Sequence, residues 1–253
     1  RLARVVTDAG YEVAEAARMD ARTHHRVGKS DLLDAHRIGA SVLPLEDDRL
    51  RHPRSDAGLR PALRVLTSAR ENMSSERTAS VNALTALLRT ADLGLDARKP
   101  LTNGQITEVA SWRTRVEDLE LAAARAEAYR LAKRVRALDI ELADNRSQLE
   151  ELLRQSKAAP LLDVIGVGPV TAAVAYSAWS HRGRLRDEAA FAALAGVSPI
   201  PASSGNTTRH RLNRGGDRRL NRALHMATVT RMAHDPETRA YVDRRRAEGR
   251  TTK

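Results

Sequence analysis

The chain has 253 residues, a formal net charge of +11 and no cysteine. A strong positive charge is typical of proteins with a polyanionic partner, and the lack of cysteine excludes disulfide bonds and thiolate metal sites. No apolar run is long enough to span a membrane. Because only 3% of the residues are aromatic, the core must consist mainly of Leu, Ala and Val, a composition that favours helices.

The N-terminal segment predicts the end of a helix, a glycine turn at Gly10 and a short extended stretch over residues 11–14. Further on, Ser30 is the expected N-cap of a helix that starts at Asp31. Asp31 and Asp34 are three residues apart, so on a helix their carboxylates share a face and can bind one hard cation. The helix dipole alone also favours acidic residues in a first turn, so this pattern permits either role.

Three prolines mark a connector over residues 44–61, and two long helices are expected after it. The first covers about 62–90, turns follow over 91–104, and the second lies within 112–156, where apolar residues keep a heptad spacing. Two such helices favour an antiparallel hairpin, and pairing between two chains is the alternative. Asn145 falls on the apolar seam, where it either fixes the register from a buried position or marks a seam that frays toward water.

Residues 161–173 have the pattern of a helix-hairpin-helix motif. Gly166 and Gly168 permit a tight turn, and Ile165 and Val167 are expected to pack inward. The amides at the N-terminus of the second helix can bind a phosphate without reading the base sequence. An ordinary glycine-rich junction between two helices is the alternative interpretation.

Residues 203–219 carry the strongest chemical signal, because Ser203 and Ser204 stand on a small turn just before a cluster of arginines. Guanidinium groups bind phosphate oxygens in pairs and neutralise charge that develops at phosphorus, so a neighbouring hydroxyl suggests attack on a phosphate. The alternative is a basic loop that only holds a nucleic-acid backbone, with the serines as turn formers. The arginines of the cluster are Arg209, Arg211, Arg214, Arg218 and Arg219.

The C-terminal third of the chain carries most of the positive charge, with sixteen Arg or Lys against seven Asp or Glu over residues 181–253. A short helix is expected over 187–196 with Phe191 and Leu194 inside. A second helix is expected over 220–232, with Leu224 and Met226 partly buried.

Together these motifs resemble those of the DEDD transposases of insertion-sequence family one-ten, which are recombinases of bacterial mobile elements. Three stretches carry the resemblance. Residues 28–35 contain Lys29, Ser30 and the two aspartates, residues 165–172 contain the glycine turn, and residues 201–218 give the closest match. The resemblance covers essentially the whole chain, with the three motifs in the family's order.

The resemblance implies three domains and a mostly α fold. Residues 1–50 are expected to be the C-terminal part, and thus a remnant, of an α/β RNase H-like (RuvC-like) domain. Residues 51–157 are expected to form a helical coiled-coil arm, and residues 158–253 a helical C-terminal transposase domain with the helix-hairpin-helix and Ser-Ser-Gly motifs. The strands with the other two acidic residues of the family are expected upstream of Arg1, which makes this chain a truncated transposase whose own activity stays open.

The resemblance also implies a chemistry. Asp31 and Asp34 correspond to the last two members of an acidic tetrad that binds Mg²⁺, and Ser204 corresponds to a serine that becomes linked to DNA phosphate, with Ser203 as the second candidate. The residues expected to bind nucleic acid are Lys29, Gly166, Gly168, Arg209, Arg211, Arg214, Arg218 and Arg219.

The implied partners are DNA, an element-encoded bridge RNA and further copies of the chain, in a homodimer or tetramer formed through the coiled coil. The implied location is the bacterial cytoplasm, in association with the nucleoid. The alternative function is that of a non-catalytic nucleic-acid-binding protein with a coiled-coil arm and a basic helix-hairpin-helix module.

Overall fold

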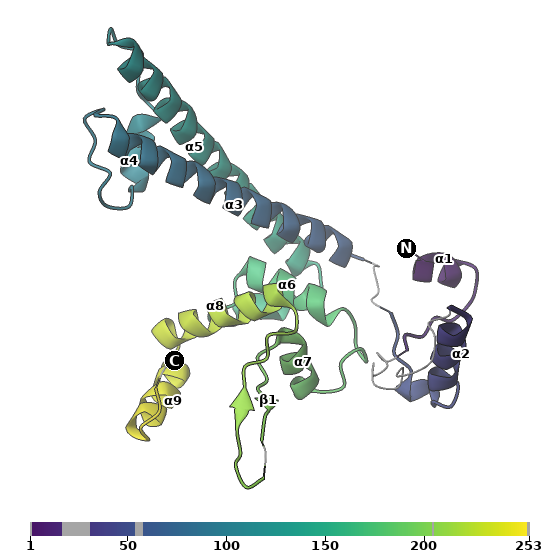
Figure 1. Ribbon diagram of the computed structural model, residues 1–253. Coiled ribbons are helices and arrows are strands. Elements are labelled where there is room, and N and C mark those ends of the chain that lie inside the picture. The colour runs from purple at the N-terminus through teal and green to yellow at the C-terminus, as the bar shows by residue number, and fades with distance from the viewer. Residues whose placement is uncertain (1, 17–30, 54–57, 204, 252–253) are drawn as a thin grey trace.

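Helices account for most of the residues that the computed structural model describes, which are 2–16, 31–53, 58–203 and 205–251. This confirms the mostly α fold (Figure 1). The α-helices are α1 (Leu2–Asp8), α2 (Asp31–Val42), α3 (Arg60–Thr90), α4 (Asn103–Val109), α5 (Leu119–Arg154), α6 (Pro169–Trp179), α7 (Glu188–Ala195), α8 (Arg218–His234) and α9 (Pro236–Ala247). The shorter elements are the 3-10 helices η2 (Asp47–Arg49) and η3 (Ala159–Asp163) and the strands β1 (Ile200–Pro201) and β2 (His210–Arg211).

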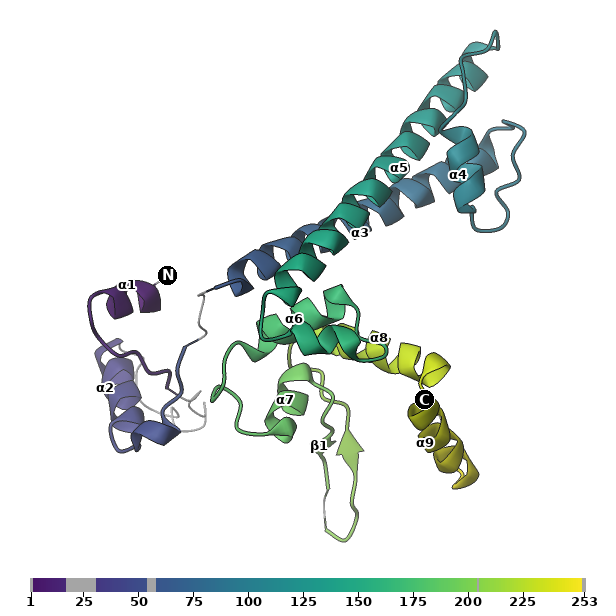
Figure 2. The same ribbon diagram turned by 180° about the vertical axis from the view of Figure 1, so that it is seen from behind.

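The long helices α3 and α5 lie side by side and run in opposite directions (Figures 1 and 2). We call the segment from α3 to α5, residues 60–154, the arm. Its apolar seam is closed within the chain, as expected for an antiparallel hairpin, because leucines of both helices are removed from water. Full burial of such a side chain stabilises a fold by about 1.5–3 kcal/mol. The largest fully buried side chains of the seam are Leu63, Leu84, Val135, Leu138, Leu149 and Leu153.

Asn145 is buried in the seam, with only 4% of its surface exposed. Its side-chain amide donates to the carbonyl of Leu66 at 3.0 Å, and Arg70 donates to its side-chain oxygen at 3.5 Å. A frayed seam is therefore the wrong interpretation. Since both ends of the amide find partners across the helix pair, Asn145 ties one register of α3 on α5, and a slipped register would leave buried polar groups unpaired.

The two long helices are joined by turns and by the short helix α4, which the sequence reading placed partly among the turns. Thr102 and Gln105 form a reciprocal capping box at its start. Ile106 and Val109 are buried and belong to the same core as α5. Gly104 lies inside this helix rather than in a turn, because the cap and the two apolar side chains outweigh the low helix propensity of one glycine.

Helix α6 connects the arm to the C-terminal helices. Ala172 and Ala173 pack with Leu149 and Leu153 of α5, while Ala178 packs with other C-terminal helices. Helix α6 is apolar on most of its surface, so it can be covered on more than one side. Its small alanine side chains let neighbouring helices approach closely.

The predicted helices of the C-terminal region are present as α7 and α8. Phe191 and Leu194 pack into the core as expected. Met226 does not, because 53% of its surface is exposed, and Leu220 and Ala227 supply the buried face of α8 instead. Helix α9 was not anticipated, since its basic composition hides any apolar stripe.

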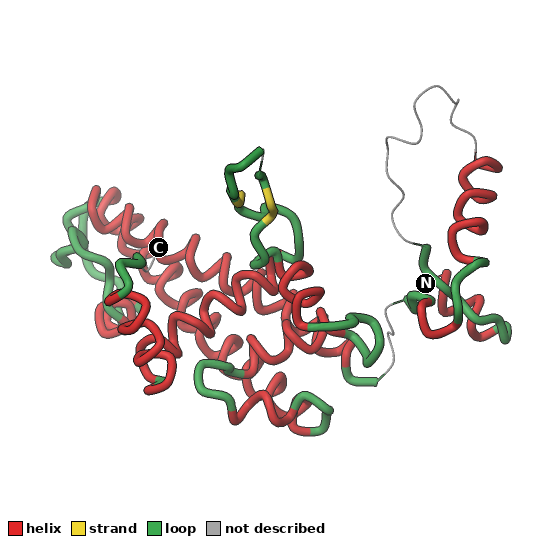
Figure 3. Tube along the Cα trace, turned by 90° about the horizontal axis from the view of Figure 1, so that it is seen from below, coloured by secondary structure: helices red, strands yellow, loops and turns green. Residues whose placement is uncertain are grey.

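The N-terminal elements α1 and α2 lie apart from the arm and from the C-terminal helices in all three views (Figures 1, 2 and 3). The predicted helix and glycine turn are present, and Gly10 has a φ of +87°. The predicted extended stretch over residues 11–14 forms no strand, and one isolated bridge follows it, between Glu15 and Arg51. Within the described ranges the remaining strand pairing is β1 with β2, so the RNase H-like remnant stays a prediction.

None of the helices in the described part of the chain combines the length and the apolar character that a membrane crossing requires.

Candidate nucleic-acid interface

The strongest chemical signal of the sequence lies on a β-hairpin that projects from the C-terminal helices (Figures 1 and 3). Strands β1 and β2 pair in antiparallel fashion, with Ile200 opposite Arg211 and Pro201 opposite His210. Ser203 belongs to this ladder through its hydroxyl, which accepts from the amide of Arg209 at 3.1 Å and donates to the Arg209 carbonyl at 3.3 Å. Ser204, the predicted nucleophile, lies outside the described residues.

Three arginines of the predicted cluster project from this hairpin and its return. Arg209, Arg211 and Arg214 are all exposed, and their guanidinium groups form no ion pair with a carboxylate of the described chain. Unpaired guanidinium groups on a protruding element are open to a polyanion, whose phosphates each accept two hydrogen bonds from one arginine. We call residues 200–217 the basic segment.

Close backbone contacts hold the base of the basic segment. Gly216 has a φ of +92°, and a Cβ there would come within 2.7 Å of the Gly196 nitrogen and the Leu194 carbonyl. Asp217 donates its amide to the Leu194 carbonyl at 2.7 Å, and its carboxylate caps α8 by accepting from the amides of Arg219 and Leu220. The Gly-Gly-Asp part of the motif is therefore the anchor of the hairpin on α7 and α8.

The remaining arginines of the cluster differ from each other. Arg218 is exposed on the first turn of α8. Arg219 instead contacts the arm, because its guanidinium pairs with Glu71 of α3 at 2.7 Å and donates to Ser68 at 3.1 Å. Arg222, which the sequence reading did not single out, also pairs with Glu71, at 3.3 Å. In this structure Arg219 thus joins the C-terminal helices to the arm, and its contact with nucleic acid stays a prediction.

The glycine turn joins the short 3-10 helix η3 to α6, and the helix-hairpin-helix motif stays a prediction. Gly166 has a φ of +86°, and a Cβ there would come within 2.7 Å of the Ala227 carbonyl. Only glycine permits this close approach of the turn to α8. Gly168 is the N-cap of α6, and its α-carbon faces open space. Val167 packs inward as predicted, whereas Ile165 is 48% exposed, so its predicted inward packing is wrong.

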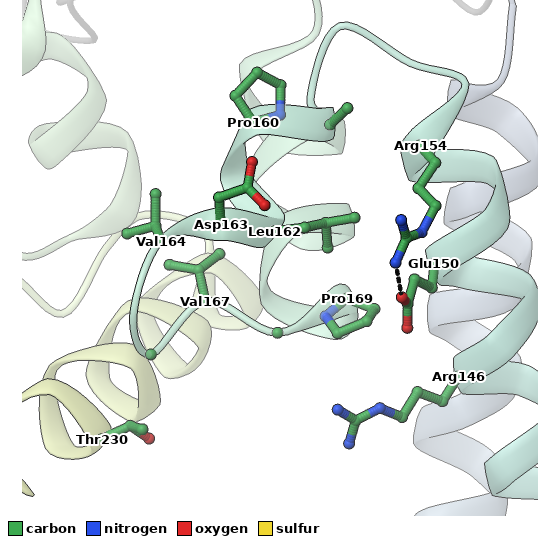
Figure 4. A pocket seen from close by; sticks show the side chains of 13 residues that line it. Arg146, Glu150, Arg154, Pro160, Leu162, Asp163, Val164, Val167, Pro169 and Thr230 are labelled. Carbon is green, nitrogen blue, oxygen red and sulfur yellow. Dashed lines mark hydrogen bonds and ion pairs between the residues drawn. The ribbon is translucent and has the colours of Figure 1, made fainter. Parts of the chain in front are cut away.

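A cleft of about 1000 Å³ separates this turn from helix α5 (Figure 4). Arg146 and Arg154 reach into it from α5, opposite Pro169 at the start of α6. Arg154 is paired with Glu150 at 2.6 Å. Arg146 has no carboxylate partner in the described part of the chain, so it offers a free positive charge on the side of the cleft that faces the N-terminus of α6.

Arg146 was not predicted, because on the heptad pattern it is one more charged residue on the flank of the helix. Only its neighbour Asn145 could have indicated its position. Because Asn145 faces the seam, the direction of the next side chain, that of Arg146, is fixed, and it points toward the glycine turn.

The acidic pair lies on α2 as predicted. Asp31 is exposed and Asp34 is half-buried in the first turn. Among the described residues, no group of three or more His, Cys, Asp or Glu side chains is arranged to hold a metal ion. Lys29 lies outside the described residues. Helix α2 is separated from the basic segment in every view (Figures 1, 2 and 3).

Residues 158–243 match the model of the Transposase IS116/IS110/IS902 family. The matched region contains the glycine turn, the cleft wall at α6, the basic segment and α8. The arm and the acidic pair of α2 lie outside it. The match therefore includes the exposed arginines of the basic segment.

Three proteins of insertion elements resemble the chain. An uncharacterized 42 kDa protein of insertion element IS900 from Mycobacterium paratuberculosis is 36% identical over 129 residues, which are 48% of this chain and 31% of that protein. A 43.6 kDa protein of IS110 from Streptomyces coelicolor is 36% identical over 42% of this chain and 26% of its own length. A 44.8 kDa protein of IS116 from Streptomyces clavuligerus is 28% identical over 88% of this chain and 66% of its own length. The chain spans less than two thirds of each relative.

Proposed function

We propose that this chain acts as a DNA transposase of a bacterial insertion sequence, and that its C-terminal region binds and cleaves DNA. The proposal rests on one observation, namely that the transposase match and the unpaired arginines fall on the same residues. The transposase match covers residues 158–243, and the same residues present Arg209, Arg211 and Arg214 without carboxylate partners on a projecting hairpin.

DNA binding is proposed to use two surfaces. One is the basic segment, and the other is the cleft beside the glycine turn, whose lining holds Arg146 and Arg154 together with Glu150 and Asp163. The basic segment would contact the phosphate backbone through its exposed arginines. The cleft beside the glycine turn would take a further phosphate between Arg146 and the amides that start α6. Both contacts address the backbone, so they position the duplex and carry no base specificity.

In the proposed cleavage step the hydroxyl oxygen of Ser204 attacks a phosphodiester. An oxygen–phosphorus bond forms, the bond from phosphorus to one sugar oxygen breaks, and that oxygen receives a proton while the serine loses one. Neighbouring guanidinium groups would stabilise the charge on the phosphorane-like transition state. Ser203 suits this role less well, because its hydroxyl is already hydrogen-bonded in both directions to the hairpin backbone.

Asp31 and Asp34 are proposed to hold Mg²⁺. Two carboxylates on one helix face fit this ion, which is commonly held by one or two protein carboxylates together with waters and substrate phosphate oxygens. When bound, the ion supplies positive charge next to the phosphate. Since α2 lies apart from the basic segment within one chain, we propose that the acidic pair of one subunit serves the serine of another, in a homodimer or tetramer. An element-encoded RNA is the proposed guide, on the basis of the sequence resemblance alone.

The nucleophile is tested by trapping a covalent protein–DNA adduct. The protein is incubated with labelled element-end DNA, Mg²⁺ and the element's RNA, and the products are separated under denaturing conditions. Ser203→Ala is the matched control, one residue away. We expect a labelled adduct with the unchanged chain and with Ser203→Ala, and none with Ser204→Ala. An adduct that persists in Ser204→Ala refutes the assignment.

The sharing of the site is tested by mixing subunits. Asp31→Asn and Ser204→Ala are each expected to be inactive when alone. If the acidic pair and the serine of one site come from different chains, a mixture restores part of the activity. Activity that stays absent in mixtures whose hetero-oligomers have been verified contradicts a shared site.

A second function is favoured by one observation, namely that the described residues offer two carboxylates and not three at the acidic site. A non-catalytic nucleic-acid-binding protein would use the same two surfaces. This second function also predicts salt-sensitive binding, but no adduct under any condition, so the adduct experiment separates the two functions.

A further inference from the structure

A separate basic concavity lies at the corner where α8 turns into α9, well beyond the basic segment in the sequence (Figure 1). It encloses about 550 Å³. No acidic residue is among the described residues that line it, whereas the lining includes Arg231, Met232, Tyr241, Arg245, Arg246 and Arg250. Its size is in the range of pockets that take a small organic group, which is about 300–1000 Å³.

A hydrogen-bonded network fixes the corner. Asp235 is 6% exposed and joins the two helices. It accepts from Arg231 at 2.6 Å and from the Thr238 hydroxyl at 2.5 Å, and Arg231 also donates to Thr238 at 3.2 Å. The hydrogen bond from Thr238, followed by the charge of Arg231, lowers the pKa of Asp235. The shape of the concavity is therefore set before any ligand enters.

The other arginines keep donors available for a ligand. Arg250 has no carboxylate partner among the described residues. Arg246 is 3.7 Å from Asp243, with both side chains more than half exposed, so water screens that pair and its contribution is small. Arg245 is held by Glu248 at 2.6 Å. A phosphate at this corner would meet guanidinium groups already arranged around it.

Tyr241 adds a flat apolar surface to these charges. Its side chain is 53% exposed and borders the concavity together with Met232 and Val242. The Arg244 guanidinium lies 5.4 Å from the ring centroid, and Arg244 is not part of the lining. An exposed aromatic ring beside arginines is the arrangement on which proteins stack the bases of single strands.

We propose that the α8–α9 concavity binds one unpaired nucleotide of a single-stranded nucleic acid, with the base against Tyr241 and the phosphate at Arg246 and Arg250. A base inside a duplex cannot stack in this way, because its neighbours in the helix cover both of its faces. The inference rests on the proposed function only in that the chain binds nucleic acid. RNA and DNA single strands share the chemistry, so both are tested.

The test measures the binding of the full chain to fluorescently labelled 12-nucleotide single strands of RNA and of DNA, and to the corresponding DNA duplex. The variants are Tyr241→Ala, Tyr241→Phe and Arg250→Ala. Arg186→Ala is the charge-matched control, because Arg186 is an exposed arginine of the same region outside the concavity. Circular dichroism and thermal unfolding verify that each variant is folded.

We expect Tyr241→Ala to weaken single-strand binding by about five- to a hundredfold, because the stacking of one base on an aromatic ring contributes a factor of this size to the affinity. Tyr241→Phe keeps the affinity, since it keeps the ring. Arg250→Ala lowers the slope of log affinity against log salt by about 0.7. The affinity for duplex DNA changes little in all three variants. The single strand, RNA or DNA, whose affinity falls more in Tyr241→Ala is the one that binds at the corner.

Single-strand affinity that is the same in Tyr241→Ala, Arg250→Ala and Arg186→Ala overturns the inference. If the chain still binds duplex DNA in that case, the proposed function stands and only the corner site is lost. A chain that binds neither single strands nor duplex contradicts the proposed function as well.

Discussion

The arm and the basic segment are both rich in charged residues, but they differ in whether those charges are paired. In the arm, many charged side chains are paired, as in Arg77 with Asp139 and Arg134 with Glu76, and Asn145 is satisfied in the seam. In the basic segment, Arg209, Arg211 and Arg214 project without carboxylate partners. Paired charges support a fold, whereas unpaired charges of one sign repel each other unless a polyanion binds them. We therefore expect the arm to serve mainly stability, apart from Arg146 at the cleft, and the basic segment to serve binding.

The largest effect that we expect from a substitution is on the stability of the arm. Leu138 is fully buried on α5, while Ile140 on the same helix is 61% exposed. Leu138→Ala is expected to lower the free energy of unfolding by about 2–5 kcal/mol, because it leaves a cavity in a packed core. Ile140→Ala, the matched control, is expected to change it by less than about 0.5 kcal/mol. Urea unfolding followed by circular dichroism measures both, and equal losses would mean that the seam is not where the structure places it.

Asn145 is the next test of the arm. Asn145→Ala removes the donor to the partly buried Leu66 carbonyl and is expected to cost about 1–3 kcal/mol. Ser147→Ala is the control, since Ser147 is exposed and hydrogen-bonds within its own helix. The same unfolding measurement applies. A loss of unfolding free energy no larger than that of the control would mean that Asn145 lies in a frayed, water-exposed part of the seam.

The contact between the two regions gives the smallest effect on stability. Glu71 on α3 holds Arg219 and Arg222, and Glu71→Gln is expected to cost less than about 1 kcal/mol because the pairs are partly exposed. It releases two arginines beside the basic segment, so DNA affinity is expected to rise. Glu76→Gln removes the same charge from a pair inside the arm and serves as the control in an affinity titration. Equal affinity changes in the two variants would show that Arg219 and Arg222 act only through net charge.

The sequence predicted the arm well because the heptad pattern on which it depends is local. Heptad spacing indicates which residues of α5 face the seam, and the buried leucines follow it. The pattern could not decide whether Asn145 was buried, because that depends on the backbone of α3 and on Arg70. It also missed α4, whose cap and two apolar residues are too short a signal.

The candidate site could be predicted only in part. Its motifs identified the basic segment and the glycine turn, but not how each residue is used. Gly216 and Asp217 anchor the hairpin through contacts with α7, and Arg219 reaches the arm across 148 positions of sequence to Glu71. Arg146 and the α8–α9 corner likewise arise from helix packing, which no local pattern encodes.

The most direct test of the account is the salt dependence of duplex DNA binding, measured together with thermal unfolding, for two triple variants. One replaces Arg209, Arg211 and Arg214 by alanine. The other replaces Arg98, Arg130 and Arg134, which are paired with carboxylates in the arm, and so loses the same charge.

The account predicts that the basic-segment variant keeps its unfolding temperature and loses DNA affinity, with a slope of log affinity against log salt that falls by up to about 0.9 for each phosphate contact removed. The arm variant should keep the slope of the unchanged chain. If both variants lose the same affinity and the same slope, DNA binding follows net charge alone, and the assignment of binding to the basic segment is contradicted.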